Sequence, residues 1–522
     1  PPMTFSLPTL PLRLFTFALL GSGLLGGGLT AAERKPNFIV IMADDLGFGD
    51  PSCYGGQSIL TPNIDRLAAE GRRFTSGYCS ASTCTPTRYS FLTGEYAFRR
   101  KGTGIAPPNG RLVVPPESTS IADLVKSAGY RTAVIGKWHL GLGDESGPNW
   151  NGEIKPGPRE IGFDYSFLLP TTNDRVPQVY VENQRVLNLD PADPLWVGDR
   201  KPEGGHPTGI SHRDTLKMDW SHGHNGTIHN GISRIGFYTG GTKARFRDED
   251  LADKWIEKSA AWLEANRASP FFLFFASHDP HVPRMPHERF QGATKLGYRG
   301  DAIVQFDWCV GELMKALDRL GLAENTLIVL CSDNGPVMDD GYKDGALEQR
   351  GRHRPGGPYR GGKYSVYEGG TRTPFIARWQ GRIQPGVSDE IVSTIDLAAS
   401  FAALAGATLP AAAVPDSFDV SGALTGAKGA KGRDHFLQQD NGGTGNFGFR
   451  SGNWKLVRHD TKLARNRIVE QPLENVPVPQ FQLFDLAVDP GETTDVLAQN
   501  PEVGDRLKAR LAEIVAAGRS RS

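Results

Sequence analysis

The residues in this chain whose types and spacing best suit chemistry lie in one short segment, Cys84-Thr85-Pro86-Thr87-Arg88. Pro86 fits the first turn of a helix, where its missing N–H costs nothing. Arg88 follows Cys84 by four positions, so a helix starting here places both side chains on one face. The thiol would lie at the helix N-terminus, where free N–H groups and the helix dipole favour an anion. This suits a nucleophile that attacks a sulfate or phosphate ester; the alternative is a buried structural cysteine beside a turn.

Hard oxygen ligands follow two short apolar runs elsewhere in the chain. Residues 37–43 are rich in β-formers and lead into Asp44-Asp45, and residues 326–331 lead into Ser332-Asp333-Asn334. Carboxylate and amide oxygens suit Ca²⁺ or Mg²⁺ rather than zinc or copper. Adjacent aspartates would repel each other, and a divalent cation removes that penalty. The pattern predicts a cation site; the alternative is a solvated turn.

Cations and histidines follow two further apolar runs. Residues 131–135 lead into Gly136-Lys137-Trp138-His139-Leu140-Gly141, and residues 271–276 lead into Ser277-His278-Asp279-Pro280-His281. Open α/β sheets bind ligands outside the carboxyl ends of their strands, so we expect these strand ends to converge. Fixed cations there would stabilise negative charge that develops on a departing ester oxygen.

The elements that must position these groups alternate between strand and helix. Besides the helix at Cys84, helices are expected at 62–71, 120–128, 248–266 and 301–320. Alternation of this kind predicts an α/β fold with a large, mainly parallel sheet sandwiched by helices.

The composition of the chain changes near residue 425, where the segment Gly-Ala-Lys-Gly-Ala-Lys-Gly resembles a flexible linker. We expect short strands at 447–450, 454–458 and 481–485 and a helix at 501–516. The domains are therefore predicted as a catalytic domain over 33–425 and a smaller C-terminal α+β subdomain over 430–522.

Composition bounds the class and the compartment. The formal net charge of zero argues against nucleic acid as a partner. Residues 1–32 read as a signal peptide, because Arg13 precedes an apolar run over 14–29 and Thr30-Ala31-Ala32 suits cleavage. Glycines interrupt this run, and no later stretch could span a bilayer. We therefore expect an exported protein, periplasmic or secreted, with no stable membrane span after signal cleavage. The five cysteines leave at least one unpaired.

Several of these motifs together resemble the type I, formylglycine-dependent sulfatases, of the arylsulfatase and polysaccharide sulfatase kind. C-x-P-x-R followed by Leu92-Thr93-Gly94 resembles the first signature, with Thr87 where serine is usual and Glu95 where arginine is usual. The 136–141 hexapeptide resembles the second signature, and residues 361–370 resemble a G-x-K-x-x-x-x-E-G-G segment that contains Lys363. Other matches occur in order at 61–68, 162–165, 483–486 and 489–490.

The resemblance implies an alkaline phosphatase-like fold and a set of site residues. Cys84 would be oxidised by a maturation enzyme to Cα-formylglycine, whose hydrated aldehyde is the nucleophile and whose second hydroxyl lets the covalent intermediate collapse. His278 would protonate the leaving group, His139 would act as the later base, and His281 would be structural or line the substrate pocket. The implied catalytic residues are Cys84, Arg88, Lys137, His139, His278 and Lys363. The implied ligands of the metal, usually calcium, are Asp44, Asp45, Cys84, Asp333 and Asn334.

The function expected from these features is hydrolysis of sulfate esters, on a sulfated saccharide or an aryl sulfate. The histidine-rich stretch 206–247, including His222 and His224, would recognise sugar hydroxyls or would be a variable surface insertion. Two alternatives stay open: a phosphonate or phosphate diester hydrolase of the alkaline phosphatase superfamily, and a non-catalytic binder of anionic glycans. Such a binder would keep its affinity after Cys84→Ala, since it needs no oxidisable cysteine.

Overall fold

The computed structural model describes residues 1–4, 34–440, 446–459 and 478–521. The expected signal peptide lies almost wholly outside these residues. Residues 35–522 form one compact unit, so the predicted boundary between 425 and 430 stays a prediction. Within the described residues, no helix combines the length and the apolar character needed to cross a membrane.

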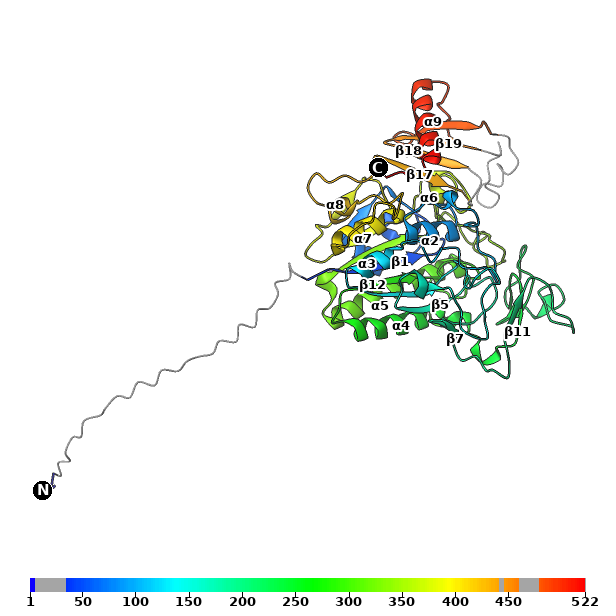
Figure 1. The fold of residues 1–522 in the computed structure, drawn as a ribbon, viewed down its shortest axis with the longest axis horizontal. Coiled ribbons are helices and arrows are strands. Elements are labelled where there is room, and N and C mark those ends of the chain that lie inside the picture. The colour runs from blue at the N-terminus through cyan, green and yellow to red at the C-terminus, as the bar shows by residue number, and fades with distance from the viewer. Residues whose placement is uncertain (5–33, 441–445, 460–477, 522) are drawn as a thin grey trace. The chain divides into compact units, whose positions relative to one another are not determined.

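A ten-stranded sheet organises the fold and confirms the predicted α/β class (Figure 1). In spatial order its strands are β15 (Gly386–Ser388), β2 (Arg72–Phe74), β14 (Ile376–Arg378), β13 (Thr326–Ser332), β1 (Asn37–Ala43), β12 (Phe271–Ala276), β4 (Arg131–Lys137), β5 (Tyr165–Leu169), β6 (Val181–Glu182) and β7 (Arg185–Val186). The five central strands, β13 to β5, are parallel. Antiparallel pairs occur only toward the two edges, at β14, β6 and β7.

Both faces of the sheet are buried because β1 is apolar throughout. Phe38, Val40 and Met42 point into one core cluster, and the alternate residues Ile39 and Ile41 point into the other. The first cluster takes in helices α2 (Cys84–Thr93), α3 (Ile121–Ser127) and α7 (Leu397–Ala405). The second takes in α1 (Pro62–Ala69), α4 (Leu251–Asn266) and α5 (Gly297–Leu320). Figure 1 shows these two helix layers on opposite sides of the sheet.

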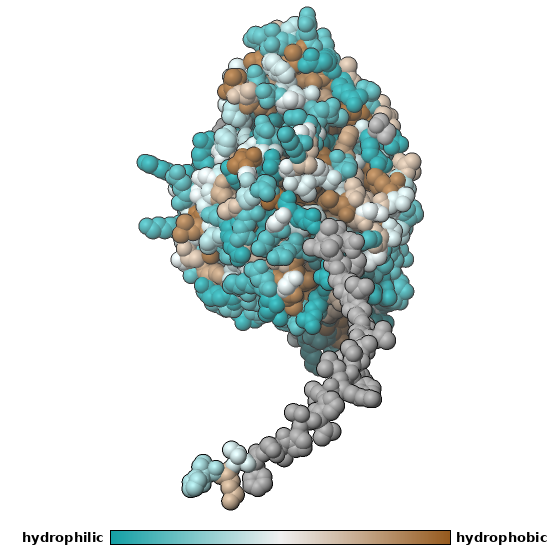
Figure 2. All heavy atoms as spheres, turned by 90° about the vertical axis from the view of Figure 1, so that its left-hand side faces the viewer, coloured by the Kyte–Doolittle hydropathy of each residue, from teal (hydrophilic) through white to brown (hydrophobic). Residues whose placement is uncertain are grey.

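The expected helices differ from the observed ones only at their ends. The helix expected from 301 begins earlier, at Gly297, and the first turn expected at 248–250 is a 3-10 turn that leads into α4. Ser120 caps α3, where its side chain accepts from the Asp123 N–H at 3.0 Å. Hydrophilic residues cover most of the face seen in Figure 2, and apolar ones occur there in small scattered groups.

The C-terminal part is a four-stranded antiparallel sheet with a helix packed on it, which agrees with the expected α+β subdomain. Its elements are β17 (His435–Gln439), β18 (Phe447–Ser451), β19 (Trp454–Arg458), β20 (Phe481–Asp485) and α9 (Pro501–Ala516). Lys455 on β19 reaches Glu368 at 3.0 Å, a buried ion pair that joins this sheet to the main body. Smaller elements are β3 (Gly77–Tyr78), β8 (Trp196–Gly198), β9 (Ile228–His229), β10 (Ile232–Ser233), β11 (Phe237–Thr239), β16 (Val392–Ser393), α6 (Glu368–Thr371) and α8 (Ser421–Thr425).

Candidate active site

Cys84 is the first residue of α2, as the sequence predicts, and only 2% of it is exposed. Its Sγ lies 3.1 Å from Nδ1 of His139. His139 Nε2 donates to the Ala106 carbonyl at 3.2 Å, which leaves Nδ1 free to accept from the thiol. Burial raises the pKa of the Cys84 thiol, and Lys137 and Lys363 only partly offset this. The unmodified side chain is therefore a neutral thiol and a weak nucleophile.

Arg88 lies one turn along α2 and is fully buried beneath Cys84. Its Nε and its terminal nitrogen bind the same oxygen of Asp333, at 3.0 and 2.9 Å. A third nitrogen donates to the Lys137 carbonyl at 3.0 Å. Burial alone would lower the pKa of Arg88, but Asp333 and Asp44 raise it, so the guanidinium stays charged. Arg88 thus links α2 to the ends of β13 and β4.

Four oxygen-bearing side chains meet where β1 and β13 end side by side. The two strands pair up to Ala43 and Ser332, which brings the following residues into contact. The Asp45 N–H donates to Asp333 Oδ1 at 3.3 Å, and Asn334 Nδ2 donates to Asp45 Oδ1 at 2.6 Å. Lys137, at the end of β4, pairs with Asp44.

This cluster fits a divalent cation. Asp44 Oδ1 and Asn334 Oδ1 are buried and accept no hydrogen bond within the described part of the chain, and an unpaired buried oxygen is costly unless a ligand satisfies it. Asp44, Asp45 and His281 each offer an atom within 4.8 Å of the others. Burial and the neighbouring Asp333 raise the pKa of Asp44, a penalty that a cation would remove.

Lys363 reaches the same cluster from the long loop after β13. Its Nζ lies 3.0 Å from Asp45 Oδ2 and 2.8 Å from Asp340 Oδ2. Burial would lower the pKa of Lys363, but Asp340 and Asp45 raise it well above its usual value, so the ammonium stays charged. Asp340, which also accepts from the Tyr364 hydroxyl at 3.0 Å, was not among the predicted site residues. The one sequence signal for it is its place six residues after Asn334.

The two histidines after β12 lie in different surroundings. His278 accepts from Trp255 Nε1 at 3.1 Å, and its Nε2 is 3.5 Å from Asp279. His281 donates from Nδ1 to the Val282 carbonyl at 2.6 Å, which turns Nε2 toward Asp45 Oδ2, 4.0 Å away. The structure therefore brings His281, rather than His278, to the cation cluster.

The two predicted histidines of the 206–247 stretch also separate. His222 has an exposed ring beside the Ser221 hydroxyl. His224 is buried, and its Nε2 lies 2.9 Å from Asp174 Oδ2. Asp174 pairs in turn with Arg175 at 3.0 Å.

The segment that carries Asp174 and Arg175 follows β5, a fifth strand end that the sequence reasoning missed. Asn173 Nδ2 donates to the carbonyl of His281 at 3.3 Å. Burial alone would lower the pKa of Arg175, but the nearby Asp174, Cys84 and Asp340 raise it. This segment therefore connects His224 with the cluster around Cys84.

Comparisons with known proteins agree with this geometry. The sulfatase family model matches residues 36–407. An N-acetylgalactosamine-6-O-sulfatase of Bacteroides thetaiotaomicron is 46% identical, and the match covers 92% of this chain and 93% of the relative. Human arylsulfatase A is 33% identical over 93% of this chain and 88% of its own length.

Solved structures show the same relationship. One, from work on glycosaminoglycan metabolism by Bacteroides thetaiotaomicron, superimposes with a TM-score of 0.88 at 45% identity, covering 92% of this chain and 99% of its own. The sulfatase PsFucS1 from Pseudoalteromonas has a TM-score of 0.69 at 25% identity, covering 94% of this chain and 92% of its own. The chain therefore belongs to the sulfatase family and is a sulfuric ester hydrolase.

Proposed function

We propose that this enzyme removes sulfate from a sulfated saccharide, with residue 84 in the formylglycine form and a calcium ion at the ends of β1 and β13. The observation that carries the proposal is the set of buried cations and histidines that lie at Cys84 and the adjoining carboxylates: Arg88, Lys137, His139, His281 and Lys363. Such a set offers fixed positive charge to a sulfate group before the reaction begins. A sulfate monoester carries a single negative charge. Arg88, Lys137 and Lys363 are paired with Asp333, Asp44 and Asp45, and a bound divalent cation would offset part of this carboxylate charge, so that the site could attract the sulfate.

The cation would be held by Asp44, Asp45, Asp333 and Asn334, together with residue 84. An all-oxygen donor set suits Ca²⁺, and Mg²⁺ is the other candidate. When bound, the ion supplies Lewis-acid polarisation of a sulfate oxygen. Arg88 holds Asp333 in place for this set, because it occupies one oxygen of that carboxylate.

The remaining residues would position and move protons. Lys137 and Lys363 would hold sulfate oxygens. His139 Nδ1 already faces residue 84 at 3.1 Å, so it can take the proton whose removal frees sulfate from that side chain. His281 would protonate the departing alcohol oxygen, the role that the resemblance assigned to His278, because it is the one of these two histidines that is turned toward the cluster. Its Nδ1–H is held by the Val282 carbonyl, so the proton would leave from Nε2 of the imidazolium form. Burial, Lys363 and Lys137 lower the pKa of His281, and the negative charge of a bound sulfate ester would favour the protonated ring. His278 would instead support the turn through Trp255.

Saccharide recognition would fall to the segment after β5 and the buried histidine beside it. Asp174 and Arg175 present a carboxylate acceptor and a guanidinium donor close to the site, and such groups pair with sugar hydroxyls. His224, whose ring nitrogens contact Asp174 and the His222 carbonyl, would hold Asp174 in place. His222, with its exposed ring, would lie at the rim. The relative named an N-acetylgalactosamine-6-O-sulfatase supports a 6-sulfated amino sugar as the substrate.

Maturation would have to precede folding. Every residue of α2 is buried, so a modifying enzyme could not reach Cys84 in the folded protein. The apolar run over 14–29 supports export to the periplasm or the exterior, with the oxidation made on the extended chain.

The test is a comparison of matched esters with protein shown by mass to carry the aldehyde at position 84. We expect sulfate release from 6-sulfated N-acetylgalactosamine and from 4-nitrophenyl sulfate, and slower release of nitrophenol from the matching phosphate diester. Cys84→Ala should abolish both sulfatase activities. Faster turnover of the phosphate diester would favour the second candidate, a phosphodiester hydrolase, and undiminished glycan affinity with no turnover would favour a binder.

A further inference from the structure

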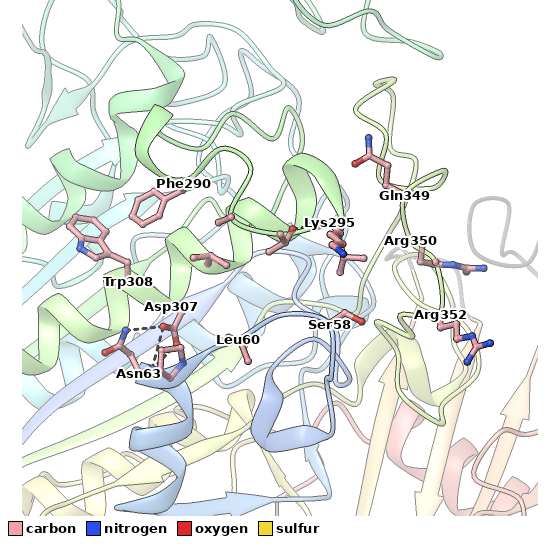
Figure 3. Close-up of a pocket in the computed structure, with 16 residues that line it drawn as sticks. Ser58, Leu60, Asn63, Phe290, Lys295, Asp307, Trp308, Gln349, Arg350 and Arg352 are labelled. Atoms are coloured by element: carbon pink, nitrogen blue, oxygen red, sulfur yellow. Dashed lines mark hydrogen bonds between the residues drawn. The ribbon is translucent and has the colours of Figure 1, made fainter.

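One pocket of the protein lies next to the loop after β13, the loop that also carries Lys363, and the chemistry described above does not use it. It has a volume of about 810 Å³ and lies between the start of α1, the start of α5 and the loop after β13. Figure 3 shows Phe290 and Trp308 at one end, Arg350 and Arg352 at the other, and Lys295 between them. The pocket therefore combines aromatic rings with a row of cations.

The charge of this pocket is strongly positive in a chain whose net charge is zero. Lys295, Arg350 and Arg352 are exposed and make no side-chain hydrogen bond or ion pair within the described residues. The only carboxylate in the lining, Asp307, is already occupied by the N–H groups of Asn63 and Ile64, at 3.0 and 2.8 Å. Three cations of the lining thus have no side-chain partner in the described part of the chain, and Figure 3 shows the side chains of Arg350 and Arg352 extending outward from the loop, at the outer end of the pocket.

The loop that carries the arginines is held rigidly. His353 is buried between the exposed Arg352 and Arg354, and its Nε2 lies 2.8 Å from Asp50 Oδ1. Asp50 also binds the guanidinium of Arg299 from α5, at 2.7 and 2.6 Å. The Pro355 carbonyl accepts from the Gly49 N–H at 2.7 Å. Cations on an anchored loop lose little freedom when they bind an anion.

The same anchor ties the pocket to the catalytic cluster. Gly47 lies two residues after Asp45, and a side chain at Gly47 would collide with the Pro355 carbonyl. Pro336, two residues after Asn334, lines a neighbouring hollow of about 370 Å³ together with Arg350, Arg352 and Arg354. The arginine loop is therefore packed directly against the two segments that supply the cation ligands.

We propose that this pocket, lined by Trp308, Lys295, Arg350 and Arg352, is a second binding site for the sulfated polysaccharide from which the catalytic centre removes sulfate. The Arg289 guanidinium already covers one face of Trp308, 4.4 Å from the ring centroid, so a sugar ring would pack on the other face. Guanidinium groups bind sulfate by paired hydrogen bonds. This inference rests on the proposed saccharide substrate, and it makes the enzyme select chains over single sugars.

The binding test uses the inactive Cys84→Ala protein and a chondroitin 6-sulfate hexasaccharide, measured by calorimetry at two salt concentrations. The double variant Arg350→Gln/Arg352→Gln should bind about fivefold to tenfold more weakly, with a smaller salt dependence, since each exposed charge pair contributes modestly. A matched control, Lys428→Gln/Arg506→Gln, removes two exposed charges that do not line the pocket, and should bind within about twofold of the parent. Trp308→Leu should weaken binding of the sulfated and of the desulfated hexasaccharide by the same factor.

The kinetic arm separates this inference from the proposed function. In the matured enzyme, the double variant should lose at least fivefold more kcat/KM on the hexasaccharide than on 4-nitrophenyl sulfate. Equal losses on both substrates, or binding by the double variant as tight as by the control, would overturn the inference while leaving sulfatase activity intact. Arginine-dependent binding in a protein that hydrolyses no sulfate ester would do the reverse. Equally tight, equally arginine-dependent binding of polyglutamate would show a general polyanion surface and would also overturn it.

Discussion

His281 and His278 offer a matched pair for testing how the leaving alcohol is protonated. Both are buried, both follow β12, and they are three residues apart. Only His281 presents a ring nitrogen to the cluster, 4.0 Å from Asp45, with its other nitrogen fixed on the Val282 carbonyl. Replacement of each by alanine therefore separates proton transfer from packing.

The expected magnitude follows from these contacts. A general acid contributes about 10²–10⁴ in rate, or about 3–5 kcal/mol of transition-state stabilisation. His281→Ala should lose that much kcat/KM on a saccharide sulfate, whose alcohol needs a proton to leave. It should lose less than about tenfold on 4-nitrophenyl sulfate, whose phenolate leaves unprotonated. His278→Ala leaves the Trp255 N–H without its acceptor, so it should cost about 1–3 kcal/mol of unfolding free energy.

The assay measures kcat/KM on both substrates, with thermal unfolding as the control for folding. His278→Ala should change the two substrates in the same proportion. The reasoning fails if His278→Ala shows the leaving-group-dependent loss and His281→Ala does not. Equal losses from His281→Ala on both substrates would also refute it, because they would indicate a role in binding rather than in proton transfer.

Three further predictions follow from the same geometry. Dialysis against a chelator should lower both the activity and the unfolding temperature. Adding Ca²⁺ at about a hundred times its Kd should restore about 2.7 kcal/mol of unfolding free energy. An unfolding temperature that does not change on dialysis would rule out a bound cation. Burial alone would raise the pKa of Asp50, but Arg299 and His353 lower it from 3.8 to about 2. The ionised carboxylate therefore contributes about 2 kcal/mol to the free energy of unfolding, and this contribution is present above pH 3.8 and is lost as the pH falls toward 2. Asp50→Asn should therefore be less stable than the parent at pH 7, with a gap that narrows between pH 4 and pH 2 in denaturant titrations; a constant gap would contradict this. Arg88→Gln leaves Asp333 buried without its partner, so we expect the free energy of unfolding to fall by about 3–5 kcal/mol and turnover to become undetectable. A variant as stable as the parent would show that the Arg88–Asp333 pair does not stabilise the fold.

The residues at the strand ends could be predicted because a strand that is apolar on both faces must lie in the interior of a sheet that is covered on both sides. Residues 37–43 and 326–331 belong in the middle of a parallel sheet, and the polar residues after them must then lie at one edge. The convergence of these strand ends was predicted in this way, whereas the roles of Asp44, Asp45, Asp333, Asn334 and Lys137 came from the resemblance to the sulfatases. The helix at Cys84 was found because Pro86 and the four-residue spacing are local signals.

Residues in loops could not be placed by the same reasoning. Which of His278 and His281 faces the site depends on the path of the turn and on Trp255, a contact 23 residues away in sequence. Asp340 and Arg175 follow strands by several residues, and no periodicity governs the direction of such segments. The pocket at Trp308 arises where α1, α5 and a distant loop come together, which only the folded chain reveals.

The outermost strands of the central sheet have a consequence for how the protein behaves in a crowded compartment. β15 has three residues and β7 has two, although the strands in the middle have up to seven. A strand from another molecule finds too few unpaired backbone N–H and C=O groups at either edge of the sheet to form a stable β-ladder. A broad sheet of this size would otherwise offer two long templates for self-association, and the blunt margins remove them without any cost to the strands that carry the chemistry.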